Sequence, residues 1–388
     1  MKKKVCVLTA TRAEYGLLKP VIGKLLAVPE FDVRIVVTGM HLSPEFGLTY
    51  KEIEHDGILI DRKIDILLSA DTPTAISKTM GLAMMGFAEY FDQLQPDLLM
   101  VLGDRYETLA VCCAAMNQRI PIAHLHGGET TEGAVDEGIR HAITKLSYLH
   151  FTSTEEYKQR VIQLGEDPKR VFCVGATGIE NILHETLLSK NELEKSLGFL
   201  LDKPYGIVTF HPVTLEGDYS AGQFQELLTV CGKHQEMKFI FTKANADAHG
   251  RVINQMIDNY VITHDNAVAF PSLGMVRYLS AIQHSAMVVG NSSSGIVEAP
   301  SFGVPTINIG DRQKGRIQAN SVLNCIPEQD AIERAFTLAM TDEFQAKAQN
   351  TINPYGNGKT SGKIVDTIAE FLSNDKINLK KSFYDLWG

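Results

Sequence analysis

Short apolar runs alternate with amphipathic helical stretches along this 388-residue chain. In the first half, apolar runs that are typical of buried parallel strands occupy residues 5–9, 32–38, 98–102, 120–125, 149–152 and 170–174. Helical periodicity lies between them, at residues 15–26, 75–94, 107–117, 136–146 and 155–164, and Thr154 is a suitable N-cap. Strand–helix alternation of this kind predicts a parallel, doubly wound sheet.

The same alternation restarts in the second half of the chain. A helix-like stretch at residues 181–200 separates the two series, and further strands are expected near residues 205–210, 238–241, 268–270, 287–289 and 306–309. A chain of this length is too long for one ordinary core. We therefore predict an α/β protein with two Rossmann-like, doubly wound domains facing a cleft, at residues 1–180 and 181–361.

The composition excludes several classes of protein. It is 44% apolar and 21% charged, as in ordinary globular proteins, and the formal net charge of -9 argues against a nucleic-acid surface. The apolar stretch at residues 5–10 is too short for a signal peptide or a membrane helix, so we expect a cytoplasmic protein with no membrane partner. The six cysteines lack metal-ligand spacing, and neither disulfides nor a zinc site are expected.

The densest set of ionisable side chains lies between residues 103 and 141, next to the carboxyl ends of two predicted strands, where open α/β sheets assemble their sites. A reaction that removes and returns a carbon-bound proton needs an acid and a base on opposed faces of the substrate. Three carboxylates in this stretch can provide them: Asp104, Glu129 and Asp136. The plain alternative is a set of helix caps and salt bridges to Arg105 or Arg140.

A second candidate site lies in the second half of the chain. The turn GNSSSG at residues 290–295 precedes a helical run at 296–302, and such a turn offers backbone N–H groups and hydroxyls to a diphosphate. Glu298, one turn into the helix, is placed for the hydroxyls of a sugar, and Arg312 follows the next strand. The plain alternative for the turn is a serine-capped helix without a ligand. The plain alternative for Glu298 and Arg312 is a solvated surface charge.

Two more side chains follow predicted strands. His211 comes after the strand at 205–210 and can donate to a phosphate or move a proton, although a lone histidine is more often structural. Arg12 follows the first strand and can hold a phosphate; the plain alternative is that it is a surface charge. The chain has neither a GxGxxG nor a Walker motif, so NAD and ATP are poor candidates.

A metal centre is a less favoured alternative for the first site. His124 and His126 are two residues apart on a predicted strand, so their side chains share one face. Together with Asp104, Glu129 and His141, which are close in sequence, they could bind a metal. A hydrolytic metal centre leaves the serine turn and Arg12 without a role, whereas a nucleotide-sugar site uses both. We therefore predict neither a metal nor a cofactor.

Seven motifs in order resemble one known family, the hydrolysing UDP-N-acetylglucosamine 2-epimerases of bacterial sialic acid biosynthesis. They are TRAEY at 11–15, VTGMH at 37–41, GDR at 103–105, HLHGGE at 124–129, IRHAITK at 139–145, HPVT at 211–214 and GNSS at 290–293. The resemblance implies a glycosyltransferase-B-like fold, a last helix at about 362–388 that packs back on the first domain, and a homodimer or homotetramer. It also implies a metal-free conversion of UDP-N-acetylglucosamine and water to N-acetylmannosamine and UDP.

In that family, removal of the C2 proton and anti elimination of UDP give a 2-acetamidoglucal, which water then attacks while C2 is reprotonated from the other face. By resemblance, Asp104 and Asp136 are catalytic carboxylates and His211 assists the departure of UDP. The predicted catalytic set is Asp104, His126, Glu129, Asp136 and His211. The predicted substrate-binding set is Arg12, Arg105, Arg140, His211, Asn245, Ser292, Ser293, Glu298 and Arg312.

One position departs from the family pattern. Many relatives have a third catalytic glutamate where this chain has His126, although bacterial members with histidine there also exist. A histidine can act as a base or an acid, but its neutral form carries no charge, so the proton assignment among His126, Glu129 and Asp104 stays open.

Three other functions fit the same residues. One is a 2-epimerase of a modified sugar such as UDP-N,N'-diacetylbacillosamine, on the legionaminic acid pathway. Another is a UDP-sugar glycosyltransferase, which has no need of carboxylates clustered in the first domain. The third is a nucleotide-sugar sensor that binds UDP without turnover.

Overall fold

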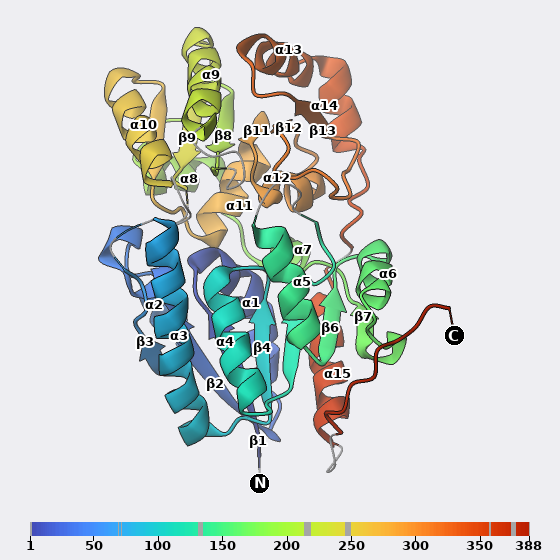
Figure 1. The fold of residues 1–388 in the computed structure, drawn as a ribbon. Helices are drawn as coiled ribbons and strands as arrows, with labels where there is room; N and C mark the ends of the chain where they lie inside the picture. Colours follow the sequence, from blue (N-terminus) through green and yellow to red (C-terminus); the bar gives the residue numbers. More distant parts are fainter. Residues whose placement is uncertain are drawn as a thin grey trace. The chain divides into compact units, whose positions relative to one another are not determined.

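The computed structural model describes residues 2–68, 70, 72–130, 135–212, 219–244, 250–356, 358–373 and 378–387. The chain divides into two compact units (Figure 1). Unit 1 comprises Met1–Glu129, Asp136–Leu183 and Tyr355–Gly388, and unit 2 comprises Thr130–Val135 and His184–Pro354. Each unit has its own sheet and its own core.

The sheet of unit 1 has seven described strands, all parallel, in the order β3-β2-β1-β4-β5-β6-β7. They are β1 (Lys3–Thr9), β2 (Phe31–Thr38), β3 (Ile60–Ile64), β4 (Leu98–Leu102), β5 (Ile122–Leu125), β6 (Leu149–Thr152) and β7 (Val171–Cys173). Successive side chains of a strand point to opposite faces, so Val5 and Val7 join one core cluster while Cys6 and Leu8 join another. Both faces of this sheet are therefore buried.

Helices cover both faces of that sheet. Residues of α1 (Arg12–Leu26) and α15 (Thr360–Ser373) pack into the cluster with Val5, and residues of α3 (Pro73–Leu94) and α4 (Tyr106–Asn117) into the cluster with Cys6. The other helices of unit 1 are α2 (Tyr50–His55), α5 (Asp136–Leu146), α6 (Glu155–Gln163) and α7 (Thr177–His184). The C-terminal helix α15 thus belongs to the core of unit 1.

Unit 2 repeats this architecture with six described parallel strands in the order β10-β9-β8-β11-β12-β13. The strands are β8 (Tyr205–Thr209), β9 (Lys238–Thr242), β10 (Ala267–Phe270), β11 (Met287–Gly290), β12 (Thr306–Ile309) and β13 (Val322–Cys325). The helices are α8 (Lys190–Leu197), α9 (Tyr219–Lys233), α10 (Gly250–Thr263), α11 (Met275–His284), α12 (Ser293–Val297), α13 (Gln329–Ala339) and α14 (Asp342–Gln349). The predicted α/β class with two doubly wound sheets is confirmed.

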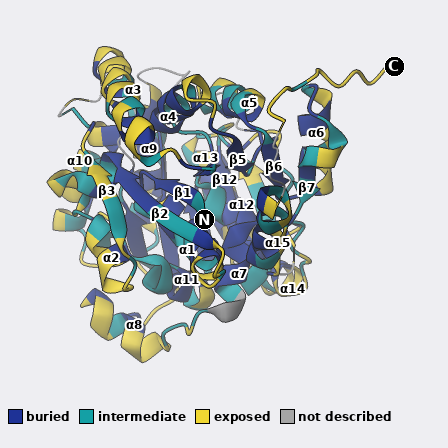
Figure 2. Cartoon of the chain, turned by 90° about the horizontal axis from the view of Figure 1, so that it is seen from below, coloured by how far each residue is buried: buried dark blue, intermediate teal, exposed yellow. Residues whose placement is uncertain are grey.

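Two strands were not predicted, and both lie at a sheet edge. β3 reads IDRKI and is only partly buried (Figure 2), and β13 reads VLNC with no fully buried residue. An edge strand has a single neighbour and an exposed flank, so it needs no continuous apolar run. The apolar-run criterion therefore missed these two edge strands, although it found the other two, β7 and β10.

Two helix predictions need correction. The stretch at 181–200 is two helices, α7 in unit 1 and α8 in unit 2. The helix predicted at 296–302 begins earlier and ends at Val297, and a 3₁₀ turn at Ala299–Phe302 follows it. Pro300 has no backbone N–H, so it cannot donate the hydrogen bond that would continue α12. None of the described helices combines the length and the apolar character needed to span a bilayer.

Candidate functional site

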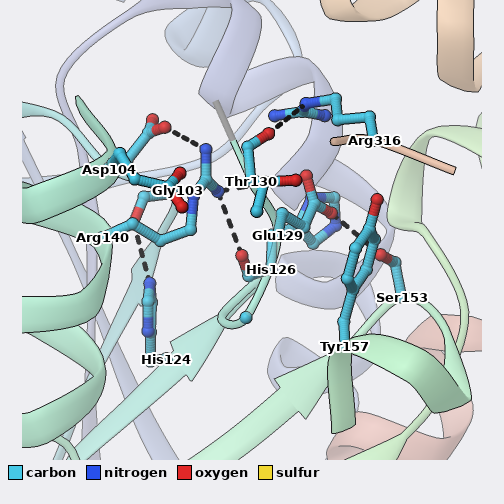
Figure 3. A network of polar contacts seen from close by, with 12 residues as sticks. Gly103, Asp104, His124, His126, Glu129, Thr130, Arg140, Ser153, Tyr157 and Arg316 are labelled. Carbon is cyan, nitrogen blue, oxygen red and sulfur yellow. Dashed lines mark hydrogen bonds and ion pairs between the residues drawn. The ribbon is translucent and has the colours of Figure 1, made fainter. Parts of the chain in front are cut away.

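In unit 1, an ion pair joins Asp104 to Arg140. Asp104 lies two residues after the end of β4, and the side chain of Arg140 on α5 is almost completely buried. Arg140 Nη2 donates to Asp104 Oδ2, and Nη1 donates to the carbonyl of His126 at 3.1 Å (Figure 3). One guanidinium therefore holds the loops that follow two adjacent strands.

His124 supports the same loops from inside the sheet. It is fully buried in β5, and its Nε2 lies 2.7 Å from the carbonyl of Gly103 (Figure 3). Its Nδ1 lies 3.2 Å from Thr144 Oγ1. Burial lowers the pKa of His124 to about 3, so the ring is neutral. Since a carbonyl only accepts, we infer that Nε2 carries the proton and fixes the turn before Asp104.

His126 has a different environment from His124. It follows β5 with a left-handed backbone (φ 64°), and its Nε2 lies 3.5 Å from the backbone N and 3.2 Å from Oγ1 of Thr177. A backbone N–H only donates, so we infer that Nε2 is the unprotonated nitrogen. His126 Nδ1 then directs its proton toward Glu129 Oε1, 3.4 Å away.

Glu129 is the most enclosed of the three predicted carboxylates. It is 2% exposed, accepts a hydrogen bond from Ser153 Oγ at 2.8 Å, and lies 3.9 Å from Arg140 Nη1. The structure thus brings Asp104, His126 and Glu129 together around Arg140. Neither Ser153 nor Thr177 was predicted, because their proximity depends on strand β6 and helix α7.

Asp136 is the first residue of α5 and is partly buried. It lies four residues before Arg140, so both side chains point to the same side of the helix. His141 instead pairs with Glu137, at 3.1 Å on the same helix. Within the described ranges, no group of three or more potential ligand side chains is arranged to hold an ion.

Arg12 and Arg105 follow β1 and β4, the neighbouring strands at which the strand order of unit 1 reverses. Open α/β sheets bind ligands at this kind of switch point. Arg12 Nε binds Glu52 Oε2 on α2 at 3.0 Å, and Arg105 Nε binds Glu107 Oε1 at 2.6 Å. Glu107, 1% exposed, was not predicted, although its position two residues after Arg105 was a usable signal.

In unit 2, His211 and the serine turn follow the adjacent strands β8 and β11. His211 is buried, and Ser292 is the N-cap of α12, accepting a hydrogen bond from the Ser294 N–H at 3.4 Å. Because α12 has only five residues, its dipole contributes less to anion binding than the predicted helix would. Ser293 is the first residue of α12, and Asn245 lies outside the described residues.

Arg312 reaches the same strand end. Its Nη1 donates to the carbonyl of Asn291 at 3.1 Å, and the buried Gln313 donates to the same oxygen from Nε2 at 2.8 Å. Asn291 belongs to the GNSSSG turn and Gln313 is the neighbour of Arg312, but neither was predicted to have a role.

Tyr278 on α11 was also missed. Burial raises its pKa to about 12; the polar groups of Ser294, Thr209 and Ser292 oppose that rise, and the charge of Glu298 adds to it. The phenol therefore lies among the polar groups of the serine turn and near Glu298, the residue predicted to bind a sugar.

Comparison with known proteins gives the family. The sequence profile of the family described as UDP-N-acetylglucosamine 2-epimerase matches residues 24–369. The chain belongs to this family. It is 43% identical to the GDP/UDP-N,N'-diacetylbacillosamine 2-epimerase (hydrolyzing) of Campylobacter jejuni, over 99% of this chain and 100% of that protein. It is 40% identical to polysialic acid biosynthesis protein P7 of Escherichia coli, over 99% and 98% of the two chains.

Solved structures of 2-epimerases share the fold of this family member. The UDP-GlcNAc 2-epimerase from Neisseria meningitidis, crystallised with UDP-GlcNAc, superposes with a TM-score of 0.81 at 21% identity, over 95% of this chain and 100% of that one. The glycosyltransferase-B-like fold expected from the sequence is thereby confirmed.

Proposed function

We propose that this member of the epimerase family is a hydrolysing 2-epimerase that converts UDP-N-acetylglucosamine and water to N-acetylmannosamine and UDP. The observation that carries the proposal is the arrangement around Arg140 in unit 1. One buried guanidinium binds Asp104 and the carbonyl of His126 and lies near Glu129. A protein that only binds nucleotide has no need of such a set of proton-transfer groups.

The reaction divides into an elimination and a hydration. A carboxylate of unit 1 takes the C2 proton, the electron pair forms the C1–C2 double bond, and the C1–O bond to UDP breaks. Water then adds its oxygen to C1 of the glucal, and C2 receives a proton on the opposite face. Proton removal and return on opposite faces of the sugar need two carboxylates, carried by different elements. Asp104, which follows β4, and Asp136, on α5, are the best candidates.

Unit 2 supplies groups for the nucleotide in this proposal. Ser292, Ser293 and Arg312 bind the diphosphate, and His211 stabilises the phosphate oxygen that leaves C1. Glu298, beside Tyr278, accepts hydrogen bonds from the hydroxyls of a sugar. The positive charge of Arg312 stabilises the departing UDP.

A second substrate is favoured by the 43% identity to the diacetylbacillosamine enzyme of Campylobacter jejuni. UDP-N,N'-diacetylbacillosamine also carries UDP at C1 and an acetamido group at C2, so the same proton transfers apply. The 40% identity to the polysialic acid protein supports N-acetylmannosamine production for sialic acid synthesis. Relative kcat/KM for the two UDP-sugars decides between them.

The test is incubation with each UDP-sugar in deuterated water, with and without EDTA. We expect free 2-epimerised sugar with one deuterium at C2, one UDP per sugar, and equal rates in both buffers. Product without deuterium at C2, or product that forms only when an acceptor is added, contradicts the proposal and favours the glycosyltransferase. UDP binding without turnover of either sugar favours the sensor.

A further inference from the structure

The side chain of Asn291 binds the backbone of His211 in both directions. Asn291 Oδ1 accepts from the N–H of His211 at 2.7 Å, and Nδ2 donates to the carbonyl of His211 at 2.8 Å. Asn291 is 1% exposed. Rotating the amide by half a turn would set donor against donor and acceptor against acceptor, so a single orientation is compatible with both bonds.

The backbone of Asn291 adds a second set of contacts. Its carbonyl accepts from Arg312 Nη1 at 3.1 Å and from Gln313 Nε2 at 2.8 Å. The next residue along the chain is Ser292, the N-cap of α12. Asn291 therefore connects His211, Arg312 and the serine turn, which lie on three different segments of unit 2.

Gly290 brings Asn291 to this place. It has a positive φ of 127°, and a Cβ atom there would stand 1.9 Å from the carbonyl oxygen of Thr209 on β8. Only glycine permits this approach of the two strand ends. The N–H of Asn291 donates to the same Thr209 carbonyl at 3.1 Å, which places its side chain opposite His211.

We infer that Asn291 is a positioning residue, which sets the imidazole of His211 through its side-chain amide and the guanidinium of Arg312 through its carbonyl. The inference rests on the proposed function, in which these two cationic or donor groups contact the diphosphate of a UDP-sugar. Neither contact by Asn291 requires that it touch the substrate. Its effect is on the placement of the groups that do.

The direct test is Asn291→Asp, which keeps the acceptor for the His211 N–H but replaces the donor with an oxygen facing the His211 carbonyl. We expect kcat to fall by roughly 10²-fold, the cost of a displaced catalytic group. We also expect the dissociation constant of UDP, measured by calorimetry, to rise roughly tenfold, the equivalent of one lost hydrogen bond.

The matched control is Asn266→Asp in the same unit. Asn266 is also buried, and its Nδ2 donates to the carbonyl of Met237 at 3.0 Å. It precedes β10 at the amino end of the sheet, whereas Asn291 follows β11 at the carboxyl end. We expect a comparable loss of melting temperature in both variants, with UDP affinity and kcat unchanged in the control alone.

Equal UDP affinity and kcat in Asn291→Asp and Asn266→Asp overturns the inference. If Asn291→Asp does not fold, the test uses Gln313→Met. This variant removes one donor to the Asn291 carbonyl and leaves the two hydrogen bonds between Asn291 and the His211 backbone in place. A UDP affinity equal to that of the wild type then overturns the inference. If the wild type binds UDP but turns over neither sugar, the proposed epimerase function fails, while the UDP affinities still test the positioning role. A wild type that does not bind UDP removes both proposals.

Discussion

Arg140 on helix α5 and Asp104 after strand β4 form an ion pair across 36 residues of sequence. The side chain of Arg140 is 3% exposed, so it cannot turn toward solvent. The orientation of Asp104 therefore depends on where α5 packs. Because Asp136 is the first residue of the same helix, α5 positions two of the three predicted carboxylates of unit 1.

Arg140→Lys tests this dependence. An ammonium group lacks the planar fork that serves Asp104 and the His126 carbonyl together, so we expect kcat to fall by at least roughly 10²-fold. Asp104→Asn should abolish turnover while UDP affinity, measured by calorimetry, is retained. Arg34→Lys, which alters a pair with Asp32 and Asp61 on β2 and β3, is the control and should keep its kcat. Wild-type kcat in Arg140→Lys would refute the role of the ion pair.

The two histidines of the HLHGGE motif should be neutral in opposite tautomers. The contact with the Gly103 carbonyl predicts a proton on Nε2 of His124, and the contact with the Thr177 N–H predicts a proton on Nδ1 of His126. Long-range ¹H–¹⁵N spectra at pH 7.5 distinguish the tautomers, and the variants His124→Gln and His126→Gln assign the signals. The same tautomer in both rings would disprove this description of the network.

Stability should depend on pH through His124. Burial lowers its pKa from the ordinary 6.5 to about 3, so between these values the unfolded chain binds a proton that the folded chain does not. The free energy of unfolding therefore falls as pH decreases below 6.5, by about 2 kcal/mol at pH 5 for one such group. His124→Gln keeps a donor for Gly103 and should remove this part of the pH dependence between pH 7.5 and 5 in urea unfolding.

Two comparisons accompany that measurement. His41 is buried with a pKa of about 3 and acts in the same direction, so the His124→Gln variant should keep a residual dependence of stability on pH. The exposed His55 is the control, and His55→Gln should leave the pH dependence of the wild type unchanged. An identical slope in His124→Gln and wild type counts against a buried neutral His124.

The C-terminal segment should stabilise unit 1 through Lys381. The carboxylate of the buried Glu166 pairs with Lys381 Nζ at 2.7 Å, Lys145 Nζ at 2.6 Å and His150 Nε2 at 3.0 Å. Burial alone would raise the pKa of Glu166, but these hydrogen bonds lower it to about 2. Lys381→Met should cost about 1–3 kcal/mol of unfolding free energy in urea at pH 7. The exposed neighbour Lys380→Met is the control, and equal stabilities would exclude this anchoring role.

Much of the candidate site could be predicted from the sequence because its residues stand directly after central strands. Asp104, His211 and Ser292 each follow an apolar run, and parallel strands end at a common edge. Gln313 was missed, since a buried polar side chain looks like any solvated one until its partner is known. The edge strands β3 and β13 were missed because polar residues interrupt their apolar runs, at residues 61–63 and at Asn324.

The sequence by itself determined the fold class and the two sets of polar residues, because burial on both faces of a parallel sheet imposes apolar runs and leaves chemistry to the loops between them. Only the tertiary structure decided how those residues are held. Arg140 meets Asp104, His126 meets Thr177, and Asn291 meets His211 across separations that no local periodicity encodes. These contacts depend on the packing of helices against strands and on the close approach of β11 to β8, so they follow from the folded sheet rather than from the spacing of residues.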